Sequence, residues 1–329
     1  MGEFELLAKL RDRLPPNDPR VRLGSGDDAA VTVPGAATAT SVDAIVDGVH
    51  FRRAETTPHL IGRKAISTAL SDLAAMGADA GEAYVALGAP EDLGEEEFLA
   101  LLDGVLEVCA ETGTSLAGGD VTRAPALTLA ITVVGHARGP DELVPRAGAE
   151  AGDLLVLTGE IGGAAAGRLL LDDPALAAAV SESTADHLRH RQLDPAPRLR
   201  SGSALAEAGA RAMIDLSDGL AGDALRVAEA SAVELRIEAG SLPLAKGVAE
   251  VAAAAGRDPL ELAVSVGEDY ELLAALPPQR LAEASAQIGA AAEATLTPIG
   301  EVRLGGGVEI RLPGGGLLES RGYDHLAGP

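Results

Sequence analysis

The sequence predicts a two-domain protein of mixed α/β (or α+β) class. The chain has 329 residues, whereas a single domain usually has about 100–200. Helical and strand-like apolar patterns alternate in both halves, which favours helices layered on sheets. A turn-rich stretch over residues 139–152 separates the halves. We therefore expect one domain over 1–138 and a second over 139–329.

The first half contains clear signals for the start and end of helices. Pro58 stands near the first position of a helix, and Gly77 follows its end. Residues 118–120, Gly-Gly-Asp, are expected to form a loop. The predicted helices cover 4–14, 57–76 and 93–112, and the predicted strands cover 29–33, 37–42, 83–87 and 126–136.

The second half repeats this alternation with shorter elements. Apolar runs bounded by glycine, proline or aspartate predict buried strands, and longer alanine- and leucine-rich segments predict helices. The predicted strands cover 154–158, 212–215, 233–237, 271–276, 297–303 and 308–312, and the predicted helices cover 164–171, 201–210, 219–231, 245–255 and 278–291.

The chain is strongly acidic. It carries 26 Lys and Arg against 50 Asp and Glu, a formal net charge of −24. An anionic surface repels the phosphates of nucleic acids and of anionic lipids, so neither a nucleic acid nor a membrane is an expected partner. Aromatic residues make up only 2% of the chain, which also argues against stacking platforms for single-stranded bases.

A single cysteine, Cys109, excludes an intrachain disulfide and a multi-cysteine metal site. It lies in an apolar helical pattern and is expected to be buried rather than nucleophilic. The acidic N-terminus lacks the apolar core of a signal peptide, and the sequence contains no run of about 18 apolar residues. We expect a cytoplasmic protein.

Six stretches place acidic residues beside glycine, serine and alanine, at predicted junctions of strands and helices. Taken singly, each aspartate is explained as a helix cap or a turn former. Taken together, they suggest side chains that meet around a ligand which the backbone can approach closely. The six stretches are 24–30, 41–43, 71–77, 118–123, 215–220 and 267–272.

Several carboxylates in one pocket require cations. Two of them at ~4 Å repel by about 4 kcal/mol at an effective dielectric of about 20. An oxygen-rich ligand set without cysteine or paired histidine favours Mg²⁺ over zinc. Mg²⁺ held by carboxylates and substrate phosphates is the usual arrangement for phosphoryl transfer, and it explains how an acidic protein binds a nucleotide.

The common nucleotide and catalytic motifs are absent from the sequence. It has no Walker A loop, no protein-kinase motifs and no Gly-x-Ser-x-Gly elbow. Residues 24–29 fit the dinucleotide pattern formally, but a strand rather than a helix is predicted after them. The glycines of 159–167 do lie between a strand and a helix. They serve either tight packing, which is the favoured interpretation, or an anion site.

Two histidines and one arginine have alternative interpretations. His50 lies close to the acidic stretches and is either a substrate contact or a polar surface residue. His136 ends a predicted strand and is expected to be structural. Arg146 lies in a loop, from which it either reaches a phosphate or stays exposed.

The acidic stretches, in this order, resemble those of the thiamine-monophosphate kinase family, within the aminoimidazole ribonucleotide synthetase-like superfamily. The similarity runs from residues 2–4 to residues 322–325, and the motifs are specific only as a set. The resemblance implies Mg²⁺- and ATP-dependent conversion of thiamine monophosphate to thiamine diphosphate. It also implies a homodimer whose N-terminal domains bind ATP and Mg²⁺ and pair their sheets, while the C-terminal domain completes the active site.

The resemblance further implies roles for individual residues. The implied metal ligands are Asp28, Ser41, Val42, Asp43, Asp72, Asp120, Asp215 and Asp218. The implied nucleotide contacts are Gly119, Asp120, Arg146 and Ser217, and the implied substrate contacts are His50, Glu268, Ser320 and Tyr323.

Two positions depart from the family pattern. Val42 stands where the family often has a hydroxyl residue, so that only its backbone carbonyl is available to a metal. Ser320 stands where the family often has an aromatic residue, so that Tyr323 or Tyr270 would have to supply the stacking on the thiamine ring.

No catalytic base is expected. The acceptor is a phosphate oxygen that is already anionic at neutral pH, so in-line transfer needs alignment and charge neutralisation, and we expect no phosphoenzyme. Two alternatives stay open from the sequence: another ATP-dependent enzyme of the superfamily, such as an aminoimidazole ribonucleotide synthetase, and a non-catalytic acidic binding protein with solvated aspartates.

Overall fold

The computed structural model describes residues 9, 13–14, 19–23, 30–291 and 294–318. Contacts along the chain divide it into two compact units. The first comprises residues 1–73 and 78–140, and the second comprises 74–77 and 141–329. Within the described ranges, no helix has both the length and the apolar character needed to span a bilayer.

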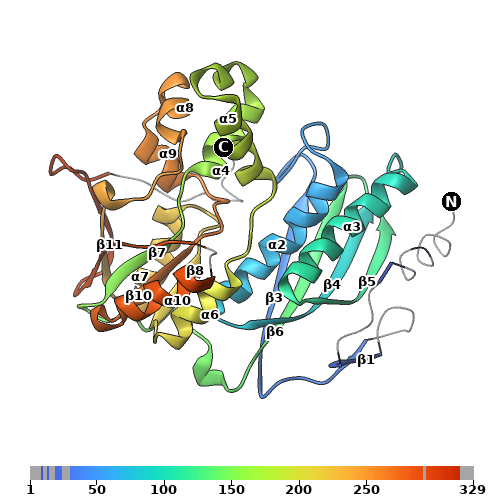
Figure 1. Ribbon diagram of the computed structural model, residues 1–329, viewed down its shortest axis with the longest axis horizontal. Helices are drawn as coiled ribbons and strands as arrows, with labels where there is room; N and C mark the ends of the chain where they lie inside the picture. The colour runs from blue at the N-terminus through green and yellow to red at the C-terminus, as the bar shows by residue number, and fades with distance from the viewer. Residues whose placement is uncertain (1–8, 10–12, 15–18, 24–29, 292–293, 319–329) are drawn as a thin grey trace. The chain divides into compact units, whose positions relative to one another are not determined.

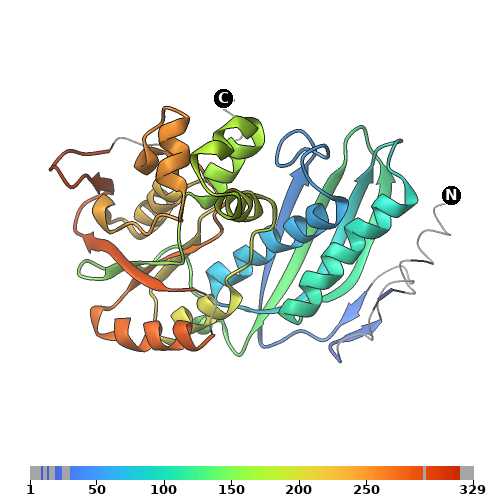
Figure 2. The ribbon, with the colours of Figure 1, turned by 45° about the horizontal axis from the view of Figure 1, so that its top comes forward.

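The first unit is built on a four-stranded sheet in the order β3-β6-β4-β5. β6 pairs antiparallel with both β3 and β4, whereas β4 and β5 run parallel. Two helices, α2 and α3, lie side by side over one face of this sheet (Figure 1), and the turned view shows the same layering (Figure 2). The bounds are β3 Ala37–Val46, α2 Pro58–Met76, β4 Asp79–Ala89, α3 Glu95–Thr112, β5 Ser115–Arg123 and β6 Thr128–Ala137.

Local signals at the helix ends explain α2 and α3. The hydroxyl of Thr57 accepts a hydrogen bond from the backbone N–H of Leu60 (3.3 Å), and Pro58 begins α2 as predicted. Gly77 follows its end with a φ of 66°, a backbone conformation that favours glycine. At the start of α3, the Glu97 carboxylate accepts the backbone N–H of Gly94 (3.0 Å).

Two glycines let α2 and α3 touch at the backbone. A Cβ added to Gly62 of α2 would lie 1.9 Å from the carbonyl oxygen of Leu101. A Cβ added to Gly104 of α3 would lie 2.0 Å from the carbonyl oxygen of His59. The close packing of α2 against α3 therefore requires glycine, which has no side chain, at both positions.

The Gly62→Ala variant is expected to lower the free energy of unfolding by about 1–3 kcal/mol, because the methyl group would overlap a backbone oxygen. Denaturant unfolding measures the change. Gly289→Ala is the matched control, because Gly289 lies in a helix and nothing is within 4 Å of an added Cβ. This control is expected to gain roughly 0.5–1 kcal/mol. A Gly62→Ala variant as stable as the wild type would contradict the close packing.

Two predicted elements of the first unit differ from the structure, and a third lies mostly outside the described residues. The predicted loop at 118–120 was wrong, because these residues lie inside β5. The predicted strand at 29–33 is shorter in the described residues, where β2 (Val31–Thr32) pairs with the unpredicted β1 (Val21–Leu23). Most of the predicted helix at 4–14 lies outside the described residues.

The second unit contains a six-stranded sheet in the order β12-β9-β11-β7-β10-β8. Only the β12–β9 pair is parallel among these neighbours. The strands are β7 Leu154–Thr158, β8 Ala212–Asp215, β9 Glu234–Glu238, β10 Leu272–Leu276, β11 Leu296–Arg303 and β12 Gly307–Arg311. The helices are α4 Gly163–Asp172, α5 Glu182–Leu193, α6 Leu199–Glu207, α7 Leu220–Ser231, α8 Val248–Ala254, α9 Pro259–Ser265 and α10 Leu281–Ala291. Short 3-10 turns are η1 Pro140–Glu142, η2 Pro174–Ala179, η3 Ala239–Ser241 and η4 Pro278–Arg280.

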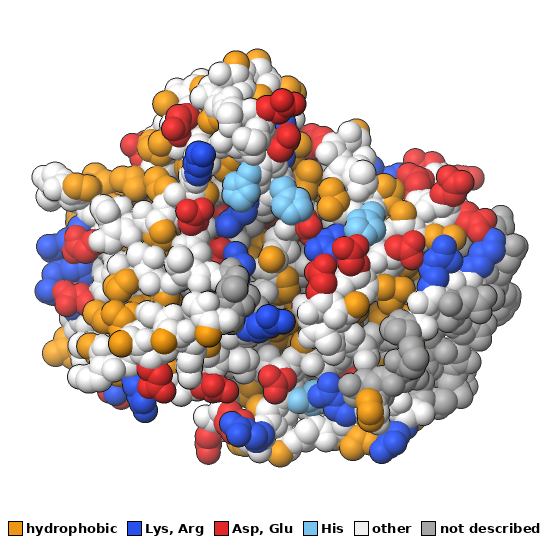
Figure 3. Space-filling model, in the orientation of Figure 1, with side chains coloured by type: hydrophobic (Ala, Val, Ile, Leu, Met, Phe, Trp, Pro, Cys, Tyr) orange, Lys and Arg blue, Asp and Glu red, His pale blue; other side chains and the backbone are white. Residues whose placement is uncertain are grey.

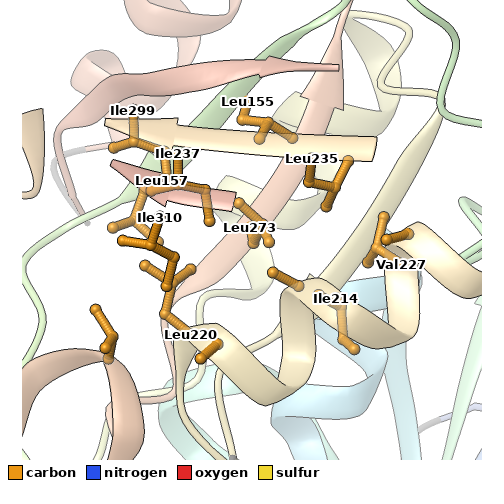
Figure 4. Packing of buried hydrophobic residues seen from close by; sticks show 14 of the residues in the cluster. Leu155, Leu157, Ile214, Leu220, Val227, Leu235, Ile237, Leu273, Ile299 and Ile310 are labelled. Carbon is orange, nitrogen blue, oxygen red and sulfur yellow. The ribbon is translucent and has the colours of Figure 1, made fainter. Parts of the chain in front are cut away.

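Alternate residues of these strands are buried on opposite faces of the sheet. Leu155, Leu157 and Ile214 pack with residues of α7, including Val227 (Figure 4). Val156 and Met213, on the other face, pack with α6 and α10. A separate apolar cluster joins α4, α5, α8 and α9. Burial on both faces explains why these strands read as continuous apolar runs in the sequence.

Two helices of the second unit escaped the sequence analysis. α5 presents mainly polar residues, and its buried side chains include only Ala185 and Leu188 among the apolar types, so its periodicity is weak. α9 has only seven residues, although Asp258 caps it by accepting the backbone N–H groups of Leu260 and Glu261.

Candidate active site

One edge of the first unit holds three of the predicted metal ligands. Ser41 and Asp43 point to the same face of β3, since side chains alternate along a strand, and the Ser41 hydroxyl donates a hydrogen bond to Asp72 of α2. The Asp43 carboxylate accepts the backbone N–H of Ala44 (2.8 Å). Ser41, Asp43 and Asp72 are half-buried. Hydroxyl and carboxylate oxygens are the ligand types that suit Mg²⁺.

Val42 contributes no side-chain ligand here, because its side chain points to the opposite face and is 67% exposed. Its backbone is better placed. Ala44 donates its N–H to Asp43, and Val46 donates its N–H to the Nδ1 of His50 (3.1 Å). Even-numbered residues of this edge strand therefore turn their backbone groups away from β6. By this alternation, the carbonyl of Val42 also faces the free edge.

His50 follows the C-terminal end of β3 and is bonded to Val46, the last residue of that strand. Because its Nδ1 accepts a backbone N–H, the neutral imidazole carries its proton on Nε2 and can donate it to an anionic oxygen. The backbone carbonyl of His50 accepts a hydrogen bond from the buried Lys64 (3.2 Å). This combination favours the interpretation of His50 as a ligand contact.

Asp120 lies at the opposite edge of the same sheet. β3 and β5 are its two outer strands, so that three strand spacings, about 14 Å, separate their backbones. The register aligns Asp120 with Ala44 through β4 and β6. Within one chain, the structure does not bring Asp120 to the Ser41–Asp72 pair. Neighbouring Gly119 is required, because an added Cβ would lie 2.1 Å from the carbonyl oxygen of Val85.

Three of the six acidic stretches do not lie at strand–helix junctions, which corrects that prediction. Residues 41–43 and 118–123 lie within strands, and 71–76 lie within α2. Ordinary carboxylates on the helices behave differently. On the surface, acidic side chains lie among Lys and Arg side chains (Figure 3), and the helices α2 and α3 are joined in this way by the pairs of Arg63 with Glu107 and Glu111.

In the second unit, the predicted nucleotide contact Ser217 and the predicted substrate contact Glu268 meet through the backbone. The N–H of Glu268 donates to the carbonyl of Ser217 (3.0 Å), and the N–H of Tyr270 donates to the carbonyl of Leu216 (3.0 Å). Gly267 permits this approach, because an added Cβ would lie 1.8 Å from the Ser217 carbonyl oxygen. Antiparallel pairing of β8 with β10, which aligns Asp215 with Leu272, sets this register.

Asp223 is an acidic residue that the sequence analysis missed. Its carboxylate accepts the backbone N–H of Asp218 (3.1 Å) and is 1% exposed. Burial, followed by the charges of Asp215 and Asp218, raises the pKa of Asp223 from 3.8 to about 8. Arg226 binds Asp218 and lies 3.8 Å from Asp223. The helical periodicity could have predicted the burial of Asp223, since this position falls on the core side of α7.

This raised pKa gives an expected pH dependence for the metal-free protein. A folded pKa above the unfolded value makes the stabilising contribution largest below about pH 4 and removes it as the pH rises toward about 8. The Asp223→Asn variant keeps an acceptor for Asp218 and is expected to lose less stability between about pH 5 and 9. Thermal unfolding in a chelator measures this, with exposed Asp186→Asn as the control. Parallel curves for wild type and Asp223→Asn would refute it.

The glycine-rich turn at 159–167 serves packing. The N-terminus of α4 is occupied by the buried carboxylate of Asp269, which accepts the N–H groups of Gly162 (2.7 Å) and Ala164 (3.1 Å). Burial raises the pKa of Asp269 to about 6, against the opposing effects of Arg191 and these two N–H groups. An internal carboxylate thus takes the place that an anionic ligand would need.

Of the remaining candidate residues, only Arg146 and Tyr270 lie in the described part of the chain. Arg146 is exposed, and its backbone carbonyl accepts a hydrogen bond from Ser231 (3.2 Å). Tyr270 is only 7% exposed, which leaves little ring surface for stacking. The residues Asp28, Ser320 and Tyr323 lie outside the described residues.

Two structural expectations are confirmed. His136 is buried, donates from Nε2 to Glu82 (2.8 Å), and accepts the N–H of Gly35 at Nδ1 (3.2 Å). Cys109 is buried, and this burial raises the pKa of its thiol to about 12, which removes the thiolate that a nucleophile requires. Among the described residues, no group of three or more His, Cys, Asp or Glu could hold a metal by itself.

Comparison with known proteins shows the family to which the chain belongs. The model of the AIR synthase related protein N-terminal domain matches residues 26–137, and that of the C-terminal domain matches residues 150–313. The chain is therefore an AIR synthase related protein with both domains of that class. This confirms the predicted two-domain α/β fold.

Individual relatives narrow this class. Thiamine-monophosphate kinase of Mycobacterium tuberculosis (strain ATCC 25618 / H37Rv) is 39% identical over 281 residues, covering 83% of this chain and 80% of that protein. The crystal structure of thiamine-monophosphate kinase from Stenotrophomonas maltophilia K279a has 34% identity and a TM-score of 0.83, covering 94% and 96% of the two chains. AaThiL complexed with AMPPCP and TMP has 29% identity and a TM-score of 0.78, covering 99% and 97%. The chain belongs to the thiamine-monophosphate kinase family, which confirms the resemblance drawn from the acidic motifs.

Proposed function

We propose that the protein transfers the γ-phosphoryl group of ATP to thiamine monophosphate, forming thiamine diphosphate and ADP. The observation that carries the proposal is the backbone hydrogen bond between Glu268 and Ser217 (3.0 Å). It holds a proposed substrate contact against a proposed nucleotide contact, as transfer between two bound ligands requires. The thiamine-monophosphate kinases among the relatives, and AaThiL complexed with AMPPCP and TMP, support both ligands.

Mg²⁺ is the proposed metal. The donors offered by the described residues are oxygens: Ser41, Asp43 and Asp72 in the first unit, and Asp215 and Asp218 in the second. The described Asp120 and the carbonyl of Val42 are further proposed ligands of the first unit, and Asp28 is also proposed. Bound Mg²⁺ would neutralise the charge on the phosphates that these carboxylates otherwise repel.

The transfer needs no general base from the chain. The attacking atom is an ionised phosphate oxygen of thiamine monophosphate. It bonds to the γ-phosphorus of ATP as the bond from that phosphorus to the β-phosphate oxygen breaks. His50 is proposed to donate from Nε2 to the substrate phosphate, and Arg146 to bind the nucleotide phosphates. Direct transfer predicts that no phosphorylated chain accumulates during turnover with labelled ATP.

A homodimer is proposed because the two edges of the first sheet carry complementary parts of one metal site. Asp43 and the Val42 carbonyl lie at the β3 edge, whereas Asp120 lies at the β5 edge about 14 Å away. A two-fold dimer that sets the β3 edge of one protomer beside the β5 edge of its partner would unite them. Ser41 is bonded to Asp72 of α2, so alternation along β3 turns the exposed Val42 side chain to the face away from α2, which supports burial of this face.

The proposed function is tested by measuring thiamine diphosphate formed from thiamine monophosphate and Mg·ATP, with and without a chelator. We expect thiamine diphosphate to form only when thiamine monophosphate, ATP and Mg²⁺ are all present, and the chelator to abolish its formation. An enzyme that binds both ligands but forms no thiamine diphosphate would refute the proposed reaction.

The Asp72→Asn variant is expected to lose Mg·ATP affinity by well over tenfold, which is more than about 1.4 kcal/mol. The change removes one charge from the Ser41–Asp72 pair while keeping the shape of the side chain. Calorimetric titration with Mg·ATP measures the loss, and Asp103→Asn on the exposed side of α3 is the control. Unchanged binding would favour an acidic protein whose aspartates are merely solvated.

A further inference from the structure

Gln192 is a buried residue of α5 that contacts the carboxylate of Glu268, the proposed substrate contact. Its side-chain amide donates a hydrogen bond to the carboxylate of Glu268, and the residue is 3% exposed. We propose that Gln192 is a positioning residue, which fixes the Glu268 carboxylate to receive the cationic, amino-bearing part of the substrate. This inference rests on the proposed function, because Glu268 is a substrate contact only under that function.

The packing of α4 against α5 places Gln192 within reach. A Cβ added to Gly167 of α4 would lie 2.0 Å from the carbonyl oxygen of Leu188 and 3.1 Å from the Cβ of Gln192. α5 therefore lies against α4 at backbone distance. Neighbouring Arg191 also ties the end of α5 to the turn before α4, through a hydrogen bond to the carbonyl of Glu160 (2.7 Å).

The backbone of Glu268 is held independently of Gln192. Glu268 and Tyr270 adopt positive φ angles of 69° and 50°, which a non-glycine residue keeps only where its surroundings impose them. Just after Glu268 in the chain, Asp269 is bound to the N-terminus of α4, and Glu271 is bound to Arg198. These anchors fix where the Glu268 side chain starts.

The Glu268 side chain itself still has three rotatable bonds, and ordering them on ligand binding costs conformational entropy. One amide donor from a buried helix selects a rotamer beforehand, which is preorganisation. A carboxylate accepts about four hydrogen bonds, so that the bond from Gln192 takes only part of its capacity. Glu268 is half-exposed, as a ligand contact must be.

A carboxylate repels the phosphate of thiamine monophosphate and attracts its positively charged thiazolium ring or the amino group of its pyrimidine. Gln192 should therefore govern affinity for the thiamine portion and leave ATP affinity alone. Binding of unphosphorylated thiamine should fall by the same factor as binding of thiamine monophosphate.

The test compares calorimetric binding of thiamine monophosphate, thiamine and Mg·ATP by wild type and by Gln192→Met, which keeps the length and removes the donor. We expect about a tenfold weaker affinity for both thiamine compounds, with Mg·ATP affinity within about twofold. Where activity is measured, the KM for thiamine monophosphate rises and kcat stays within about threefold. Gln287→Met in α10 is the matched control. Gln192→Glu, which sets two carboxylates side by side, is the second variant and should bind more weakly still.

A double-mutant cycle separates positioning from a general structural effect. On a Glu268→Ala background, Gln192→Met should cause no further loss of affinity, because the group it positions is gone. An unchanged affinity in Gln192→Met, or an equal loss on both backgrounds, would overturn the proposal. Binding is measured without turnover, so a wild type that binds thiamine monophosphate but forms no diphosphate refutes only the proposed reaction.

Discussion

Replacing Glu271 by alanine is expected to lower the free energy of unfolding by about 3–5 kcal/mol. Its side chain is fully buried. The carboxylate accepts two hydrogen bonds from Arg198 (2.8 and 2.6 Å), one from Thr158 (2.8 Å) and a longer one from Arg191 (3.4 Å). Removing it leaves a largely buried guanidinium without its carboxylate, which costs more than the pair itself contributes.

Chemical denaturation of the full chain measures this loss. Glu283→Ala is the control, since Glu283 forms an exposed ion pair with Arg280 in which the two side chains are 47% and 52% exposed. Such pairs contribute about 0–1 kcal/mol. A loss for Glu271→Ala no larger than that of the control would show that the network around β10 does not stabilise the second unit.

Mixing two inactive variants is expected to restore activity if the proposed dimer is correct. Asp43→Asn and Asp120→Asn should each abolish thiamine diphosphate formation. In a mixed dimer, one site carries both changes and the other carries neither, because each site takes Asp43 from one protomer and Asp120 from its partner. One of the two sites in every mixed dimer is intact, so the purified mixed dimer should recover about half of the wild-type activity.

Coexpression with two affinity tags, followed by assay of the doubly purified dimer, measures this recovery. The control is the pair Asp43→Asn and Asp72→Asn. Asp72 is bonded to Ser41 on the same strand as Asp43 within one chain, so both belong to one site and no recovery is expected. An absence of recovery with Asp43→Asn and Asp120→Asn would mean that one chain supplies the whole site.

The boundaries of α2 could be predicted because its signals are local. Pro58 and Gly77 act through the backbone conformations that they favour, whatever the rest of the chain does. The Gly-Gly-Asp segment at 118–120 could not be placed in the same way. Its glycines indicated a loop, but Gly119 is there because β5 passes close to the backbone of Val85 in the neighbouring strand. Tertiary contact overrode the local preference.

The candidate site shows the same division. The acidic motifs identified the family without any coordinates, because residue type and order carry that information. The motifs did not indicate which aspartates lie close together in the fold. Asp43 and Asp120 both read as metal ligands, yet the strand order sets them at opposite edges of a sheet. Asp223 lies in α7, where it was not singled out, and Gln192 lies in α5, a helix that was not predicted.

The sequence alone determined the fold class and most element boundaries, since these depend on periodicity and caps within a few positions. The set of oxygen ligands was implied by the family resemblance and is a proposal. Only the tertiary structure decided that Ser217 and Glu268 share a backbone hydrogen bond and that Asp269 occupies the N-terminus of α4. The same holds for the hydrogen bond that Gln192 donates to the Glu268 carboxylate. Those contacts join residues about 50–110 positions apart, and they follow from sheet register and helix packing, which no short stretch of sequence specifies.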